Sequence, residues 1–261
     1  MIEWPLQDIY DAIHRLLWPL FRVAGLIALA PGLSDQPIPM RIKAGLALAC
    51  ALLLAPVLAP VPSVTAGSYA GLQIAARETL VGLSLGLSMR LVFMAFIMAG
   101  EFVGLQMGLA FASFFDPGSG ANTAVTSRLI NLIALLLFFT VNGHLLMLGT
   151  LLHSYAVLPL GGTLDPNGWG ALLDWSSQLW ISGMLLALPL IIVLLTINLS
   201  LGILNRTAQQ LSVFAVGFPI TLTTGIVILT LVLPRSSAFM QNLFNQGYEA
   251  MAQVLGRLAG L

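Results

Sequence analysis

Long stretches without a charged side chain constrain this chain more than any other feature. No Asp, Glu, Lys or Arg occurs in 44–76, 129–164, 175–205 or 207–234. A helix needs about 20 apolar residues to cross the hydrocarbon core of a membrane, and each of these stretches is longer. Charged residues make up 8% of the chain, against roughly 25% in a typical soluble domain. The chain is therefore predicted to be an integral membrane protein.

Hydropathy predicts about six hydrophobic helical segments. In lipid, unpaired backbone groups are too costly for anything but helices or a closed barrel, and the runs lack the alternation of barrel strands, so the predicted fold class is all-α. The third and fourth runs are too long for plain spans, and Pro189 and Pro219 inside the last two invite kinks or breaks. We therefore expect broken or kinked helical hairpins in one domain spanning 1–261, with segments at about 14–33, 44–62, 77–114, 127–158, 176–205 and 209–233.

The C-terminal stretch 236–261 differs from the rest because its apolar residues follow helical spacing, with polar residues on the other faces. It is predicted to be an amphipathic helix that lies on a membrane or on a partner. Glu249 and Arg257 give little attraction for anionic lipid, which favours a partner. The apolar positions are Met240, Leu243, Phe244, Tyr248, Met251, Val254, Leu255 and Leu258.

Glycines recur every four residues at Gly100, Gly104 and Gly108, and a second pair stands at Gly82 and Gly86. Small residues four apart share a helix face and let another backbone approach closely. Simple tolerance of glycine in a membrane helix is the alternative. The strict spacing favours close helix packing, against a neighbour in this chain or in another.

Arg77 and Glu78 fall in or beside the membrane-level runs, and four further charged residues fall at or near membrane level: Arg90, Glu101, Arg128 and Arg206. Arg90 and Glu101 are eleven residues apart, about three helical turns, so they share a helix face. Such groups mark functional pathways or structural pairs, and the sequence leaves both open. A proton relay needs carboxylates in series, whereas Glu101 stands alone.

Asn131, Asn142 and His153 repeat the eleven-residue spacing on the fourth run, which predicts a polar stripe for interhelical hydrogen bonds. The chain has no phosphate-binding glycine loop, no zinc-protease motif and no nucleophile elbow. Ten basic and ten acidic residues balance, which argues against a nucleic-acid partner. We predict that the chain is not an enzyme and has no cofactor or metal.

The segment "GLAFASFFDPGSGANTA" at 108–124 interrupts the apolar runs with an Asp-Pro-Gly turn signal. Irregular backbone at membrane depth is tolerated only inside protein or beside water. Its phenylalanines could therefore close a wet passage. From the residues alone, an ordinary external loop is the favoured interpretation.

Two stretches resemble the FliR family of flagellar export-gate proteins: "GEFVGLQMGLAFASFFDPGSGANTAVTSRLINLIALLLFFTVNGHLLML" at 100–148 and "LGILNRTAQQLSVFAVGFPITLTTG" at 201–225. The Asn-Gly-His-Leu-Leu motif and the run from Leu204 to Pro219 are specific to that family. Gln209-Gln210 departs from the Pro-Gln found in many members. Related virulence-secretion subunits match these motifs less well, which favours the flagellar branch.

The resemblance implies a fold like FliP fused to FliQ, in a hetero-oligomeric pore with FliP and FliQ at the inner membrane of the flagellar basal body. FlhB and FlhA are implied as further partners beside membrane lipid, and unfolded flagellar proteins as the exported cargo. It also reverses the interpretation of the 108–124 segment, in favour of a pore plug. The implied plug residues are Phe111, Phe114, Phe115, Asp116, Pro117, Gly118, Gly120 and Asn122.

Two rival functions remain open at this stage. A secondary transporter for a small solute predicts an inverted internal repeat and a polar site at mid-membrane, and no convincing repeat is present. A purely structural membrane scaffold predicts that the 111–120 segment does not affect ion leak.

Overall fold

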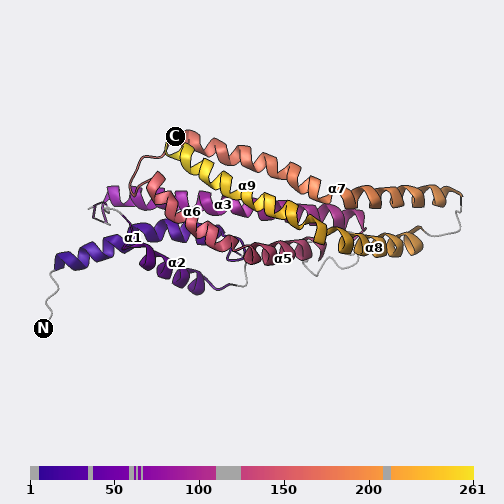
Figure 1. Ribbon diagram of the computed structural model, residues 1–261, viewed down its shortest axis with the longest axis horizontal. Helices are drawn as coiled ribbons and strands as arrows, with labels where there is room; N and C mark the ends of the chain where they lie inside the picture. The colour runs from indigo at the N-terminus through magenta and orange to yellow at the C-terminus, as the bar shows by residue number, and fades with distance from the viewer. Residues whose placement is uncertain are drawn as a thin grey trace. The chain divides into compact units, whose positions relative to one another are not determined.

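The computed structural model describes residues 6–34, 38–58, 62, 64–65, 67–109, 125–207 and 213–261. Within these ranges every regular element is a helix (Figure 1), so the prediction of an all-α fold is confirmed. In chain order the elements are α1 (Leu6–Leu29), α2 (Met40–Leu54), α3 (Tyr69–Gln106), α5 (Val125–Thr140), α6 (Gly143–Val157), η2 (Pro166–Gly168), α7 (Trp169–Thr207), α8 (Val213–Val232), η3 (Pro234–Ser236) and α9 (Ser237–Leu258).

Two helical stretches are long and apolar enough to cross a membrane by themselves, Tyr69–Gln106 and Pro166–Thr207. The pairs α5 with α6 and α8 with α9 qualify as further spans if each bent pair counts as one. The described residues thus hold two to four candidate spans. The expectation of broken membrane helices is confirmed, and the chain is treated below as a membrane protein.

The break in the fourth run falls at an asparagine. Asn142 separates α5 from α6 and has a φ of 56°, a left-handed conformation that Asn adopts more readily than most residues. By contrast, α7 runs through Pro189 and α8 through Pro219 without a break. The expectation of a helix break at either proline is therefore wrong. Neighbouring groups in a membrane protein can satisfy the carbonyl that proline leaves free.

The first three helices are displaced toward the N-terminus from their predicted ranges. The first spans Leu6–Leu29 rather than about 14–33. The second ends at Leu54, ahead of Pro56, rather than near residue 62. The third begins at Tyr69 instead of near 77 and ends at Gln106 instead of near 114. Its early start moves Glu78 from the first turn to the interior of the helix. Gly108, with a φ of 79°, stops the helix, since glycine readily adopts the left-handed conformation that follows a helix end.

The chain divides into two compact units. Unit 1 comprises Met1–Leu91, Asn142–Ser176 and Asn245–Leu261, and unit 2 comprises Val92–Val141 and Ser177–Phe244. The helices α3, α7 and α9 each contribute residues to both units. The single domain predicted over 1–261 stays a prediction.

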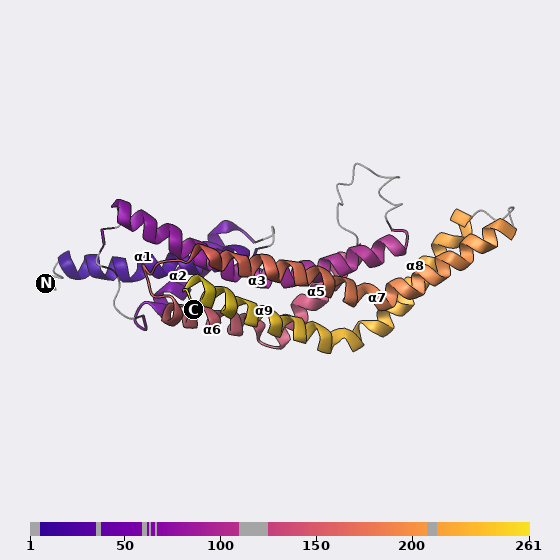
Figure 2. The same ribbon diagram turned by 90° about the horizontal axis from the view of Figure 1, so that it is seen from above.

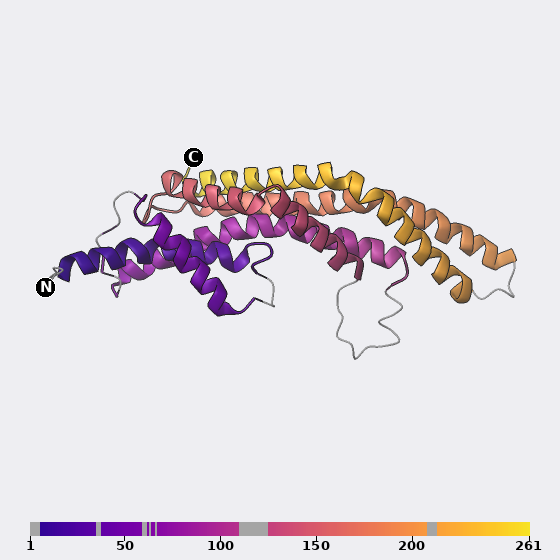
Figure 3. The same ribbon diagram turned by 60° about the horizontal axis from the view of Figure 1, so that its bottom comes forward.

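In unit 1, α1 and α2 lie side by side (Figures 1 and 3). The buried side chains of this unit include Trp18 of α1, Leu85 of α3 and Leu151 of α6. A smaller apolar cluster joins Ala171 and Leu172 of α7 to the end of α9. Unit 1 therefore has a continuous apolar interior into which any charge must be fitted with a partner.

In unit 2, four phenylalanines form an aromatic cluster: Phe93 and Phe96 of α3, Phe138 of α5 and Phe244 of α9. Their ring centroids lie 5.4–5.9 Å apart, mostly edge to face, which is the favourable geometry for aromatic pairs. The second half of α7 lies alongside α8 (Figures 1 and 2). These contacts position α3 and α5, the helices on either side of the 110–124 segment.

The apolar face of α9 is covered by this same chain. Met240, Phe244 and Met251 are at most 1% exposed, and so are Val254, Leu255 and Leu258. The interpretation of this face as a docking surface for a partner or for lipid is therefore wrong. The pattern that predicted an amphipathic helix was correct, but helical periodicity does not say which apolar surface covers the face.

Candidate functional site

Glycines bring the backbones of α1 and α3 into contact in unit 1. A Cβ at Gly82 would collide with the carbonyl of Arg22, and one at Gly86 would lie 2.7 Å from the Leu26 carbonyl oxygen. On the facing helix, a Cβ at Gly25 would lie 2.6 Å from a carbonyl oxygen of α3. Small residues on both sides are what allow this approach. The crossing leaves no room for a side chain larger than glycine at Gly82.

Arg22 extends from this crossing into the interior of unit 1 and is 0% exposed. Its Nε donates to Glu78 Oε2 over 2.7 Å, Nη1 donates to Ser154 Oγ over 2.9 Å, and Nη2 donates to the Leu158 carbonyl over 2.9 Å. The guanidinium carbon also lies 4.2 Å from the centre of the Tyr155 ring. Every nitrogen of the guanidinium group thus has an acceptor.

Glu78 is equally enclosed, at 2% exposed. Its second oxygen, Oε1, accepts from the Gly161 backbone N–H over 3.3 Å. The pair therefore ties α1, α3, α6 and the turn after α6 to one another. Removing one member of such a pair leaves a charge stranded in an apolar interior, so the two residues act as a unit.

Sequence reasoning placed Glu78 in or beside a membrane-level run but missed its pairing with Arg22. Arg22 lies in the middle of the predicted 14–33 segment, and an ionisable group at such a position requires a partner. That rule was the available signal. It could not name Glu78, which is 56 positions away in sequence, nor the hydroxyl of Ser154.

The four further charges singled out by sequence lie elsewhere. Arg90 and Glu101 are both half-buried on α3, Arg128 is exposed on α5, and Arg206 is exposed in the last turn of α7. The role of these residues at membrane level stays a prediction.

A second glycine contact joins α3 to α5 in unit 2. A Cβ at Gly100 would collide with the backbone of Ser127, and Thr126 Oγ1 donates to the Gly100 carbonyl over 2.7 Å. Gly108 has a different position, because it follows the end of α3. The Leu109 N–H donates to the Gly104 carbonyl over 3.0 Å around it, which is the hydrogen bond of a glycine helix cap.

The predicted plug residues Phe111, Phe114, Phe115, Asp116, Pro117, Gly118, Gly120 and Asn122 lie outside the described residues. The described chain ends at Leu109 after α3 and resumes at Val125 with α5. Residues on both sides of this segment belong to unit 2.

The predicted polar stripe on the fourth run is not continuous, because the helix breaks at Asn142. Asn131 is half-buried on α5, and its Oδ1 has no hydrogen-bond partner among the described residues. His153 is exposed on α6. The two lie on separate helices in separate units, so an eleven-residue spacing does not place them on one face.

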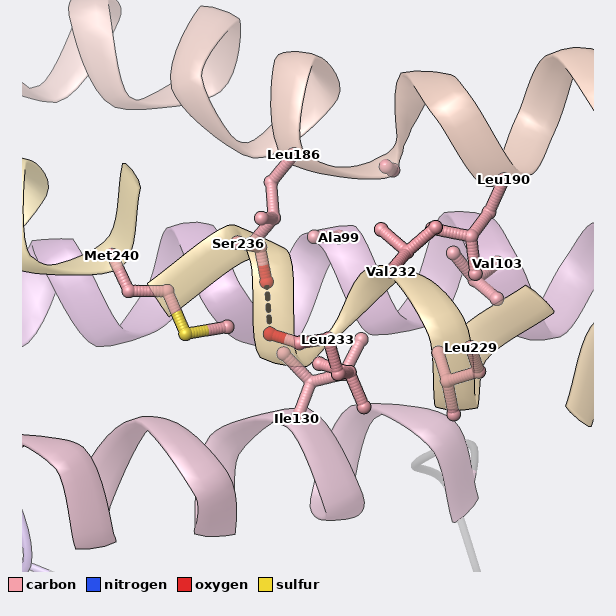
Figure 4. A pocket seen from close by; sticks show the side chains of 11 residues that line it. Ala99, Val103, Ile130, Leu186, Leu190, Leu229, Val232, Leu233, Ser236 and Met240 are labelled. Atoms are coloured by element: carbon pink, nitrogen blue, oxygen red, sulfur yellow. Dashed lines mark hydrogen bonds between the residues drawn. The ribbon is translucent and has the colours of Figure 1, made fainter. Parts of the chain in front are cut away.

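A small cavity in unit 2 lies between α3, α5, α7, α8 and the start of α9 (Figure 4). Its lining is apolar apart from Ser236, whose Oγ donates to the Leu233 carbonyl over 2.8 Å. The cavity volume is about 10 Å³, about what a single water requires. It is too small for a ligand. Among the described residues no three His, Cys, Asp or Glu side chains gather into a metal site.

Comparisons with known proteins fix the family. A family described as "Bacterial export proteins, family 1" matches residues 13–247. The chain is 43% identical to the "Flagellar biosynthetic protein FliR" of Pectobacterium carotovorum over 260 residues, covering 99% of each chain. It is 44% identical to that of Escherichia coli K12 over 259 residues, again covering 99% of each. The chain belongs to the FliR family.

More distant members match along most of their length too. The FliR of Aquifex aeolicus is 31% identical over 243 residues, covering 92% of this chain and 93% of its own. Membership makes this FliR-family chain a flagellar biosynthesis protein of the bacterial export class, which works with other export components. Its apolar helices place it in a membrane. The buried Arg22–Glu78 pair and the glycine contacts are thus features of an export-apparatus subunit.

Proposed function

We propose that this chain is a core subunit of the flagellar type III export gate. With FliP and FliQ it forms a gated pore in the inner membrane, within the flagellar basal body, and FlhB and FlhA are further partners. Unfolded flagellar subunits pass through this pore. The supporting observation is the 43–44% identity to two curated FliR proteins over essentially the whole chain, because similarity along the full length of both chains favours a shared role.

The gating element in this proposal is the 111–122 segment, which acts as a plug in the pore. Its phenylalanines exclude water and ions by apolar contact and obstruction. The chain itself carries out no catalytic turnover; energy comes from the membrane gradient and an associated ATPase. Support comes from the described flanks: at one end α3 finishes in a glycine cap at Gly108, and at the other Thr126 bonds the Gly100 carbonyl. These contacts fix the two helix ends that flank the segment.

The test is ion leak through the assembled gate. Deletion of 111–120, and separately Phe114→Ala with Phe115→Ala, should raise ion leak across the inner membrane several-fold while co-purification with FliP and FliQ is retained. Leak should rise because the apolar obstruction is lost, and assembly should be retained because the helices are unchanged. Leu132→Ala with Leu136→Ala, two side chains more than half exposed on α5, serves as a matched control and should leave the leak unchanged.

Unchanged leak in both plug variants, with assembly intact, would refute the gating role and leave only a scaffold. A small-solute transporter would instead lose uptake of one solute. A virulence-secretion subunit predicts failure to restore swimming to a flagellar strain lacking its own FliR, whereas the proposal predicts restored swimming.

A further inference from the structure

The C-terminal end of α3 is seated in a socket built by α7 and α8, all within unit 2. We define the α3 socket as Asn198 of α7 with Thr221 and Gly225 of α8. Asn198 Nδ2 donates to the Gln106 carbonyl over 3.2 Å. Thr221 Oγ1 shares its hydrogen between the Met107 carbonyl at 3.3 Å and the Phe218 carbonyl of its own helix at 3.1 Å. Two side chains from distant parts of the sequence thus bond consecutive carbonyls at the point where α3 ends.

These bonds complete the hydrogen bonding of the helix end. The last carbonyls of a helix have no partner within it. Here the Gly104 carbonyl accepts from the Leu109 N–H over 3.0 Å, and the Leu105 carbonyl accepts from the Gly108 N–H over 3.1 Å. The two carbonyls that the cap cannot reach, those of Gln106 and Met107, are the two that the socket bonds. The end of α3 is therefore fixed in position by specific donors.

The Met107 side chain adds a steric fit. It is 2% exposed and lies against Gly225, where an added Cβ would be 2.6 Å from Met107 Cγ and 2.8 Å from its Sδ. Glycine at 225 is what makes room for the methionine. Thr221, one helical turn earlier on α8, is 5% exposed, so the hydrogen bond and the steric contact lie together on one face of α8.

We propose that Asn198, Thr221 and Gly225 are positioning residues that set where the chain leaves α3, and so where the 111–122 segment begins. This inference rests on the proposed gating function. The three residues need no contact with the exported chain; they act through Gln106 and Met107. Loss of the socket frees the C-terminal end of α3 to move while the helices of the gate remain assembled.

The first experiment measures ion leak in assembled complexes carrying Thr221→Val, Asn198→Leu or Gly225→Ala. Each should raise leak several-fold with normal co-purification of FliP and FliQ. The matched controls are Thr223→Val and Gly202→Ala. Thr223 is exposed on α8 and bonds only within its own helix, and a Cβ at Gly202 on α7 would have no neighbour within 4 Å. Both should leave leak unchanged.

A compensating variant separates displacement of Met107 from general damage to α8. Met107→Ala removes Cγ, Sδ and Cε, the atoms that a Cβ at residue 225 would strike. Adding it to Gly225→Ala should therefore lower the leak toward the level of the unmodified protein. If the double variant leaks as much as Gly225→Ala alone, steric positioning through Met107 is wrong.

A second measurement does not depend on the plug. In a Cys50→Ser background, which removes the single native cysteine, Met107→Cys with Gly225→Cys should form a disulfide in the assembled gate. Failure to cross-link would show that the socket is not occupied. Suppose that the two cysteines cross-link and that deletion of 111–120 raises leak. If the Thr221, Asn198 and Gly225 variants then show no increase in leak, the positioning role alone is overturned. No leak on deletion would overturn the proposed function.

Discussion

At the scale of single residues, the Arg22–Glu78 pair is the feature that most restricts what this chain tolerates. Both side chains are almost wholly enclosed, and the arginine has three acceptors, one on α3 and two at the end of α6. Burying a charge is unfavourable unless it is paired and hydrogen-bonded. Here the glycine contact at Gly82 brings the helix backbones close enough for the pair to form.

Removing one member of the pair should be more damaging than removing both. Arg22→Leu or Glu78→Leu alone should destabilise the protein by about 3–5 kcal/mol, because an unpaired charge remains buried. The double substitution should recover much of that loss. Thermal unfolding midpoints in mild detergent measure this. Equal destabilisation by the double and single variants would show that the ion pair itself is not what matters.

At the scale of helices, glycine contacts decide which helices touch. Gly82→Ala should destabilise unit 1 by about 1–3 kcal/mol, the usual cost of overpacking a tight contact. Gly45→Ala on α2 is the matched control, because a Cβ there would have no neighbour within 4 Å. That change should be neutral or stabilising by about 0.5–1 kcal/mol, since alanine favours a helix over glycine.

Unfolding midpoints of the two alanine variants provide the comparison, with circular dichroism to check that helix content is retained. Equal midpoints for Gly82→Ala and Gly45→Ala would contradict the close approach of α1 and α3.

The helices themselves were largely predictable from sequence, whereas their breaks and partners were not. Hydropathy locates apolar helices because their length is set by the membrane. It cannot foresee that Asn142 breaks a helix while Pro189 does not, since the outcome depends on which neighbours satisfy the backbone. For the same reason it predicted an apolar face on α9 but not that the chain itself covers that face.

The candidate site was likewise predictable only in part. The Asn-Gly-His and Leu-Asn-Arg motifs pointed to the FliR family, which the full-length similarity then established. The Arg22–Glu78 pair and the α3 socket join residues more than 50 positions apart, so no local pattern contains them. Isolated polar residues in apolar runs, such as Arg22 and Asn198, were the signal that a partner must exist.

At the scale of the whole molecule, the two long apolar helices differ in how much of their surface this chain covers. In the most apolar part of α3, 61% is buried within the chain. In the most apolar part of Pro166–Thr207, which contains α7, the buried share is 22%. Side chains such as Trp180, Ile181 and Leu199 are more than 60% exposed. Such a surface needs lipid or apolar protein against it, which is consistent with a subunit that works inside a larger membrane complex.

The central claim is that the 111–122 segment lies in the pore, and imaging of the complete gate tests it most directly. The complex with FliP and FliQ is purified in mild detergent, its mass is measured, and the position of the segment is determined by electron cryomicroscopy. The account predicts that Phe111, Phe114 and Phe115 lie near the central axis and close the lumen. A lumen closed by other groups, with this segment turned outward toward detergent, would contradict it.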